Sequence, residues 1–424
     1  MSDISDTRDS RLWHPFADMG KVRHHELVIE RGEDVWVWDT EGNRYLDATA
    51  SLWYANIGHG RPEIAEAIAG QLSRLEAYSA FGDFVSPPAL ELADALAERA
   101  PMPSRVFLGS GGGDAIDTAA KLARRYFAEL QEPERTVLIS RTAGYHGTHG
   151  FGTAIAGIPA NREGFGPLLE TEVVQHDSLE AVHEAVDRVG AARIAAVFVE
   201  PVIGAGGVYP PVEGYIEGVA DLCRETGILL VIDAVICGFG RLGTWFGIER
   251  WDVQPDMITF AKGVTSGYLP LGGVMVSERV AEPFWRAPGG PVLRHGPTYA
   301  GHATCCAAAL ANLAVIEREG LLTRGRDDEQ ALLDALLPLG EHHAVAEVRG
   351  GTGTLAAVEL SAETLAEDPG AVAALVSAAR KSGVLVRPLA RAVAVSPPLT
   401  AQAEHFELIA QALANGLAGR PGVR

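Results

Sequence analysis

The sequence predicts an α/β protein with a mostly parallel central sheet flanked by helices, and with a smaller α+β domain built from both ends of the chain. Three features carry this prediction. Apolar runs of strand length, such as 194–199 and 227–232, lack the alternation of a half-exposed strand and therefore indicate strands buried on both faces. Longer segments with helical periodicity separate these runs. After residue 318 the pattern changes to helices mixed with short strands.

This change of pattern also predicts how the chain divides. With 424 residues it is long enough for one large domain and a smaller one. We expect residues 59–318 to form the large domain, and residues 1–58 and 319–424 to contribute the two parts of the small domain. The first part contains a predicted hairpin at 35–47, in which Gly42-Asn43 interrupts the alternation.

Composition excludes several classes of partner. The net charge is −20, from 35 basic and 55 acidic residues, which argues against binding to nucleic acid or to an anionic membrane. The four cysteines lack metal-ligand spacing, so no metal site is expected. The polar residues 1–11 do not form a signal peptide, and no apolar run is long enough to cross a membrane. We therefore expect a cytoplasmic protein.

Two charged residues end neighbouring apolar runs. Asp233 ends the run that starts at residue 227, and Lys262 ends the run that starts at residue 255. A lysine at the end of a strand either reaches solvent at the rim of the sheet or is a desolvated amine of low pKa, as a Schiff-base lysine must be. A buried carboxylate such as Asp233 needs a cation or a strong donor nearby.

A glycine run follows the strand predicted at 106–108. Gly111, Gly112 and Gly113 lead into a helix that reaches about residue 130. Backbone N–H groups at such a helix start can hold a phosphate, although the run could also be a simple tight connection. The spacing fits neither the dinucleotide-binding nor the P-loop motif. Together with a strand-end lysine and aspartate, the run supplies the parts that pyridoxal 5′-phosphate requires.

Other candidate residues follow the same logic. Tyr145 and His146 lie between two glycines after the strand at 137–140, and Glu200 ends the strand at 194–199. Because ligands of open α/β sheets bind at the carboxyl ends of strands, we expect these side chains at one edge of the sheet. Trp53 belongs to an aromatic, glycine-rich stretch and forms either a pocket wall or core. The aromatic cluster at 12–16 is expected at a domain or subunit contact.

Several motifs, in order along the chain, resemble those of the class III aminotransferases. The resemblance covers essentially the whole chain and implies fold type I of the pyridoxal-phosphate-dependent transferases. Segments 51–60 and 384–388 are similar to the omega-amino acid and amine:pyruvate transaminase branch, and 13–16 is also similar to diaminopelargonate aminotransferases. The motifs that carry the class are 229–241, Phe260-Ala261-Lys262-Gly263, Tyr268-Leu269-Pro270-Leu271-Gly272-Gly273 and Gly301-His302.

The resemblance implies a role for each candidate residue. Lys262 would form the Schiff base with the cofactor, and Asp233 would bond to the pyridine nitrogen. Cofactor contacts are implied for Gly111, Gly112, Gly113, Tyr145, His146, Glu200 and Val235, with Tyr145 and Val235 on the two faces of the ring. Thr298 would reach the phosphate from the neighbouring subunit, so a homodimer with shared active sites is implied. Substrate contacts are implied for Trp53, Tyr145 and a movable Arg387.

The chain departs from the class pattern around the phosphate. The family has Ser-Gly-Ser-Glu-Ala where this chain has Gly111-Gly112-Gly113-Asp114-Ala115, so a hydroxyl that contacts the phosphate is missing. The loss predicts a weaker hold on the cofactor by roughly 1.5–3 kcal/mol. It also predicts tighter binding in a Gly113→Ser variant. The family's Asp-Glu-Val is Asp233-Ala234-Val235 here.

The resemblance implies a transaminase that moves an amino group from an amine or omega-amino acid to a keto acid such as pyruvate, by a ping-pong mechanism. Three alternatives remain open. The same residues could serve a diaminopelargonate-type aminotransferase, or a pyridoxal-phosphate aminomutase or racemase. The departures from the class pattern could also belong to a non-catalytic scaffold.

Overall fold

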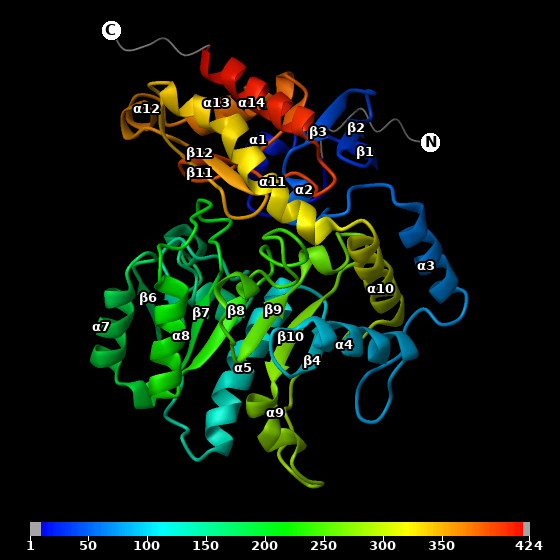
Figure 1. Cartoon of the computed structure of the whole chain (residues 1–424), viewed down its shortest axis with the longest axis vertical. Coiled ribbons are helices and arrows are strands. Elements are labelled where there is room, and N and C mark those ends of the chain that lie inside the picture. The colour runs from blue at the N-terminus through cyan, green and yellow to red at the C-terminus, as the bar shows by residue number, and fades with distance from the viewer. Residues whose placement is uncertain (1–9, 419–424) are drawn as a thin grey trace.

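The computed structural model describes residues 10–418, and its largest element is a seven-stranded sheet. The strand order is β4-β10-β9-β8-β7-β5-β6 (Figure 1). Strands β5 to β9 pair in parallel, and β10 runs antiparallel to both β9 and β4. The predicted mostly parallel α/β sheet is thus confirmed. The strands are β4 Ser104–Gly109, β5 Val137–Arg141, β6 Thr171–Val174, β7 Ile194–Val199, β8 Leu229–Asp233, β9 Met257–Phe260 and β10 Gly272–Ser277.

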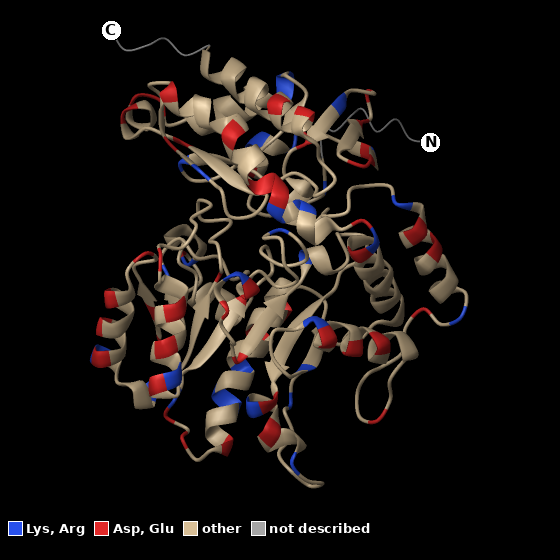
Figure 2. Cartoon of the chain, viewed as in Figure 1, with Lys and Arg blue, Asp and Glu red and all other residues tan. Residues whose placement is uncertain are grey.

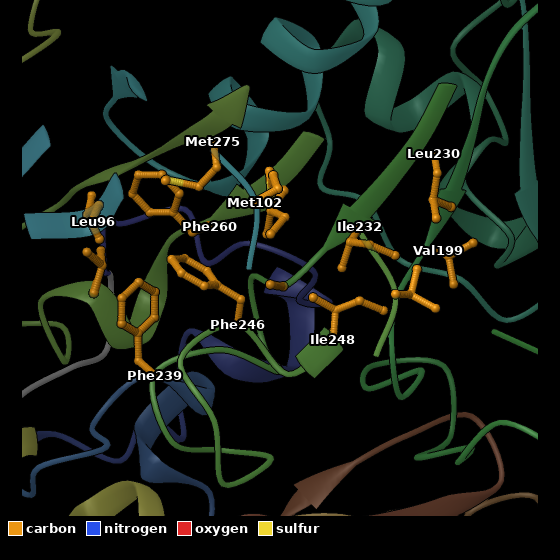
Figure 3. Packing of buried hydrophobic residues seen from close by; sticks show 14 of the residues in the cluster. Leu96, Met102, Val199, Leu230, Ile232, Phe239, Phe246, Ile248, Phe260 and Met275 are labelled. Atoms are coloured by element: carbon orange, nitrogen blue, oxygen red, sulfur yellow. The ribbon is translucent and has the colours of Figure 1, made fainter. Parts of the chain in front are cut away.

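Helices cover both faces of this sheet because successive side chains of a buried strand point to opposite sides. In β8, Leu230 and Ile232 join one core cluster, whereas Leu229 and Val231 join another. Figure 3 shows part of the first cluster, in which Phe239, Phe246 and Phe260 lie close together. The helices are α3 Pro62–Leu72, α4 Pro87–Arg99, α5 Gly112–Glu129, α6 Gly150–Ala154, α7 Leu179–Val189, α8 Tyr215–Thr226, α9 Glu278–Trp285 and α10 Ala303–Arg318.

The apolar stripes of α3 and α4 are only partly buried. Both helices begin at the prolines that the sequence indicates. Ile64 and Leu92 are fully buried, whereas Leu72 and Leu90 are 51% and 54% exposed. The described chain therefore leaves part of each stripe uncovered.

The two ends of the chain share a second unit, which we call the terminal module. One sheet has the order β1-β2-β3-β13, and β13 pairs in parallel with β3 through Val384 and Leu46. Figure 1 shows the module above the seven-stranded sheet. Its strands are β1 Ile29–Glu33, β2 Trp36–Asp39, β3 Arg44–Asp47, β11 Val345–Arg349, β12 Ala356–Leu360, β13 Val384–Leu385, β14 Arg387–Pro388 and β15 Ala392–Val395. Its helices are α1 Met19–Val22, α11 Leu321–Leu336, α12 Ala362–Glu367, α13 Ala371–Lys381 and α14 Ala403–Ala418, and α2 Ala50–Trp53 follows β3.

Some strands were not predicted from the sequence, among them β1, β6 and β11. β6 has only one fully buried residue and lies at the edge of its sheet. β11 alternates charged and apolar residues at the edge of the sheet β11-β12-β15-β14. Edge strands need fewer apolar residues because one side stays open to solvent.

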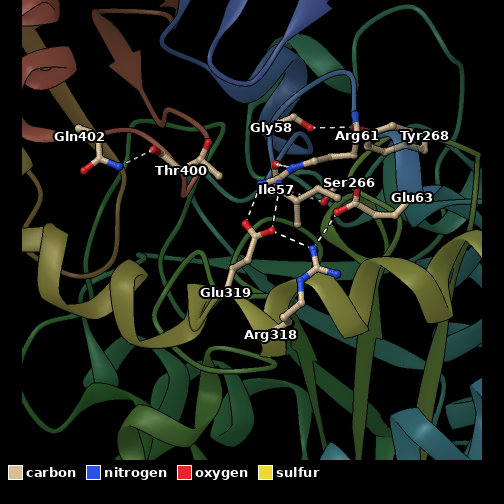
Figure 4. A network of polar contacts seen from close by, with 10 residues as sticks. All are labelled: Ile57, Gly58, Arg61, Glu63, Ser266, Tyr268, Arg318, Glu319, Thr400 and Gln402. Atoms are coloured by element: carbon tan, nitrogen blue, oxygen red, sulfur yellow. Dashed lines mark hydrogen bonds and ion pairs between the residues drawn. The ribbon is translucent and has the colours of Figure 1, made fainter. Parts of the chain in front are cut away.

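Polar contacts join the terminal module to the sheet. Arg241 is fully buried and donates from Nη1 to the carbonyl oxygens of Thr354 and Pro397, and from Nη2 to Oδ1 of Asn56. Figure 4 shows a second network, in which Arg61 binds both carboxylate oxygens of Glu319 at 2.8 Å. Because removing Arg241 would leave buried acceptors without a donor, its contacts hold the segment around Asn56 in place.

The surface of the large domain carries many acidic side chains. Acidic residues lie along the exposed faces of α3, α4, α7 and α8 (Figure 2). Within residues 10–418, no helix combines the length and apolar character needed to cross a bilayer. The same residues contain no cluster of His, Cys, Asp and Glu that could hold a metal ion.

Candidate active site

A cavity of about 450 Å³ opens at the carboxyl ends of β7, β8 and β9, next to the start of α5. This is the edge at which ligands bind in open α/β sheets. The structure brings nine of the predicted site residues together in its lining: Gly111, Gly112, Gly113, Tyr145, His146, Glu200, Asp233, Val235 and Lys262.

Lys262 lies two residues after the end of β9 and begins a short 3₁₀ turn. Its φ is +46°, a left-handed conformation that costs energy for a residue with a Cβ and often marks functional positions. Burial lowers the pKa of its amine, whereas the carboxylates of Asp233 and Glu200 act in the opposite direction. The structure therefore supports the desolvated-amine interpretation over the surface-rim one.

Asp233 is the last residue of β8, and hydrogen bonds fix both of its oxygens. Nδ1 of His146 lies 2.8 Å from Oδ2. Oδ1 accepts from the Val235 backbone at 3.1 Å and from the Thr259 hydroxyl at 3.2 Å. His146 is itself buried, so its contact with the carboxylate is shielded from water. The carboxylate is therefore held in one orientation.

Glu200 follows β7 and supports the loops around the cavity. Its Oε1 accepts from the Tyr145 backbone and its Oε2 from the Gly204 backbone, both at 3.0 Å. Burial raises the pKa of Glu200. Its carboxylate thus positions the backbone of Tyr145, whose ring also lines the cavity.

The glycine run at the start of α5 is closely surrounded. A Cβ on Gly112 would lie 3.1 Å from Cγ1 of Val235, and a Cβ on Gly113 would lie 3.0 Å from Nε2 of His149. A Cβ on Gly111 would meet nothing within 4 Å. The effect of Gly113→Ser on cofactor binding stays a prediction, and the added side chain would require the His149 imidazole beside position 113 to shift.

Trp53 does not line the cavity, contrary to the prediction for a substrate contact. It is 2% exposed and packs in a hydrophobic cluster with Val202 and Val208. Its neighbours Leu52 and Tyr54 line the cavity instead. The physical reason is local: φ is positive at Ala50, Ser51 and Trp53, and this irregular turn directs alternate side chains away from the core.

Tyr54 is a lining residue that sequence reasoning missed. Its hydroxyl accepts a 2.6 Å hydrogen bond from Ser51, and a Cβ on Gly267 would lie 2.2 Å from its ring. Gly267 has a φ of +80°, so glycine is required there for both space and conformation. Gly267, between Ser266 and Tyr268, was a sequence signal for a close approach of another side chain. The sequence could not show that this side chain is Tyr54, because the two residues are more than 200 positions apart.

Arg387 and Thr298 lie outside the cavity lining of their own chain. Arg387, in β14, is half-buried, and its buried Nε has no hydrogen-bond partner in the described structure. Burial lowers its pKa, and its charge acts on Tyr145 and Lys262. It therefore lies near the site. Thr298 is exposed.

The arrangement fits pyridoxal 5′-phosphate. The glycine start of α5 offers backbone N–H groups to a phosphate, and Lys262 offers an amine of lowered pKa for the aldehyde. The oriented carboxylate of Asp233 lines the same cavity and suits a protonated pyridine nitrogen. Val235, packed against Gly112, and Tyr145 supply apolar surface for the ring.

Comparisons with known proteins point the same way. Residues 19–417 match the family model of the class III aminotransferases. A probable aminotransferase of Mycobacterium tuberculosis is 38% identical, over 96% of this chain and 92% of its own length. The putrescine–pyruvate aminotransferase of Pseudomonas aeruginosa is 33% identical, over 93% of this chain and 91% of its own length.

Solved structures are equally similar. An amine transaminase from an uncultivated Pseudomonas species, in its pyridoxal-phosphate-bound form, superimposes with a TM-score of 0.92 at 36% identity, covering 97% of this chain and 99% of the other. An (S)-enantioselective omega-transaminase from Thermomicrobium roseum gives a TM-score of 0.92 at 39% identity, covering 98% and 97%. The cavity, the fold and the whole-length similarity together show that the chain belongs to the class III aminotransferases, fold type I enzymes that use pyridoxal 5′-phosphate.

Proposed function

We propose that the protein transfers an amino group from an amine or omega-amino acid to a keto acid such as pyruvate, in two half-reactions of a ping-pong cycle. The observation that carries the proposal is Arg387. It is a half-buried arginine near the cavity, its Nε lacks a partner in the described structure, and it stands outside the cavity lining. Relatives named putrescine–pyruvate aminotransferase and beta-alanine–pyruvate aminotransferase support the substrate class.

The residues of the cavity divide the chemistry between them. When bound, pyridoxal phosphate supplies an electron sink for the bond-breaking step. Lys262 accepts a proton at Nζ from the amine-bearing carbon and later returns one, which requires its neutral form. Burial of the amine favours that form. Asp233, held by His146 and Thr259, keeps a negative charge where the ring nitrogen would lie.

The residues that line the rest of the cavity determine which substrates can bind. Leu52, Tyr54, Ile236 and Leu271 add apolar surface to the lining. Such a wall favours an uncharged substituent in one half-reaction, whereas a keto acid brings a carboxylate in the other. An arginine that can approach the carboxylate, or remain at the edge of the site, accommodates both.

Arg387→Ala is expected to slow the half-reaction with pyruvate or beta-alanine by roughly 10- to 100-fold, because one charge-assisted contact of about 1.5–3 kcal/mol is lost. The half-reaction with an uncharged aryl amine should change little. Both are measured by stopped-flow absorbance of the bound cofactor, one substrate at a time. Arg391→Ala is the matched control, since Arg391 lies on the same segment but is exposed and pairs with Glu359. Equal losses in both half-reactions would show that Arg387 supports the fold instead.

A panel of single-substrate half-reactions tests the function as a whole. Amines and omega-amino acids should convert the cofactor to its amino form without a keto acid present, and pyruvate should convert it back. Return of the amino group to the same carbon skeleton would indicate the aminomutase alternative. S-adenosylmethionine as the best donor would indicate the diaminopelargonate type, and silence with every donor would indicate a scaffold.

We also propose a homodimer in which Thr298 reaches the partner's site. Large apolar side chains are exposed on one part of the described surface: Tyr78, Phe81, Phe84, Val85, Leu90, Val292 and Tyr299. Several of them line one surface groove, which reaches from Phe81 to Gly301. Such a patch suits an interface between copies of the chain.

Thr298→Ala is expected to weaken cofactor retention by roughly tenfold while the dimer persists, because the variant loses only one hydrogen bond to the partner's phosphate. Retention is measured by loss of cofactor absorbance on dialysis, and the dimer by sedimentation, where a mass near twice 44.9 kDa is expected. A monomer that retains full activity would contradict the shared site.

A further inference from the structure

The space beside Gly113, where the family pattern has a serine side chain, is occupied by a histidine. The imidazole of His149 packs directly against Gly113: Nε2, Cδ2 and Cε1 all lie within 3.0–3.1 Å of where a Cβ would be. A serine at position 113 would therefore require the imidazole to move by a few tenths of an ångström from its present place. The serine side chain of the family pattern is missing at the start of α5, and the larger polar side chain of His149, from a different loop, lies in its place.

His149 is oriented by the residue next to the glycine run. Its Nδ1 lies 3.5 Å from Oδ1 of Asp114, while Nε2 is the ring atom nearest to Gly113. The other oxygen of Asp114 accepts from the Ser110 backbone at 3.0 Å, which fixes the carboxylate. Asp117, one turn further along α5, is engaged with the backbone of Phe151 and Gly152. The two ring nitrogens of His149 therefore face different groups.

His149 lies next to Gly113, beside the cavity rather than in its lining. About half of its side chain is exposed, and no hydrogen bond to its Nε2 is found among the described residues. It precedes α6 and follows Gly147, which lines the cavity and approaches Gly113. An imidazolium donates from both nitrogens, so one ring can bond to Asp114 and to a phosphate at once.

We propose that His149 is a phosphate-binding residue of this enzyme, taking over through Nε2 the contact that a serine at position 113 makes in the family pattern. This contact would hold the cofactor in the same way whichever amino donor the enzyme uses. It also revises the expectation of a looser hold, because the contact with the phosphate has moved to another side chain.

The test compares pyridoxal phosphate with pyridoxal, which has the same ring and aldehyde but lacks the phosphate. His149→Ala is expected to weaken pyridoxal phosphate binding about 10- to 100-fold while leaving pyridoxal binding unchanged. Both are measured on apoenzyme by titration of the cofactor absorbance band. His149→Gln, which keeps an N–H donor, should recover part of the loss. His183→Ala, at an exposed position in α7, is the control.

Gly113→Ser in two backgrounds makes the test sharper. In the parent chain this change should not tighten binding, because the serine Cβ meets the imidazole. In the His149→Ala background it should restore much of the lost affinity, since the space is then open for a hydroxyl. The proposal is overturned if His149→Ala weakens both ligands equally, if it weakens neither, or if Gly113→Ser acts alike in both backgrounds.

Discussion

Lys262→Ala is expected to lower transamination by at least about 10³-fold while the fold and cofactor binding survive. The amine is both the group that would hold the cofactor and the base that moves the proton, and a positioned acid–base group alone contributes roughly 10²- to 10⁴-fold. The fold should persist because Lys262 lines a cavity and makes none of the hydrogen bonds that join the described elements.

The measurement is the steady-state rate with an amine and pyruvate, together with the melting temperature. Lys381→Ala is the control, because Lys381 ends α13 and is exposed. A variant that keeps more than a few per cent of the parent rate would remove Lys262 from the mechanism. A variant that fails to bind the cofactor would instead mean that phosphate and ring contacts are too weak to hold it alone.

Asp233→Asn is expected to lower the rate by roughly 10²- to 10³-fold with little change in melting temperature. The amide keeps the size of the side chain and can still accept from Val235 and Thr259, but it loses the negative charge beside the buried His146. Removing one charge from a buried, hydrogen-bonded arrangement costs about 3–5 kcal/mol. In this variant the loss would destabilise the protonated form of the ring nitrogen.

This variant is assayed by single-turnover rates and by the absorbance maximum of the bound cofactor, which reports protonation of the ring. Asp221→Asn is the control, since that residue forms an exposed pair with Arg224 on α8. An unchanged rate would assign Asp233 a purely structural role. A large fall in melting temperature would show that the charge serves mainly to satisfy His146.

The sequence was sufficient to predict those parts of the site in which a local pattern and the required residue type occur together. Asp233 and Lys262 end apolar runs whose composition requires buried strands, so their meeting at one sheet edge follows from parallel pairing. The glycine run at 111–113 similarly indicates a helix start that a ligand can approach. Edge strands were missed because half-exposed segments carry a weak apolar signal.

Contacts made across long separations could not be predicted from pattern. Trp53 was expected in the cavity because an aromatic residue in a glycine-rich stretch suits a pocket wall, but the positive φ values around it place Leu52 and Tyr54 there. The sequence shows that position 113 lacks the serine of the family pattern. Only the folded structure shows that His149 lies beside this position. The shared dimer site and the movement of Arg387 remain predictions.

Borohydride reduction of the holoenzyme followed by peptide mass spectrometry tests the central claim most directly. The chain has four lysines, and Lys21, Lys121 and Lys381 are all exposed, whereas burial lowers the pKa of Lys262. Reduction should fix one pyridoxyl phosphate group per chain on the peptide that contains Lys262, and prior incubation with an amino donor should prevent the labelling. Label on another lysine, or label that an amino donor does not displace, would contradict the assignment of Lys262 and with it the proposed chemistry.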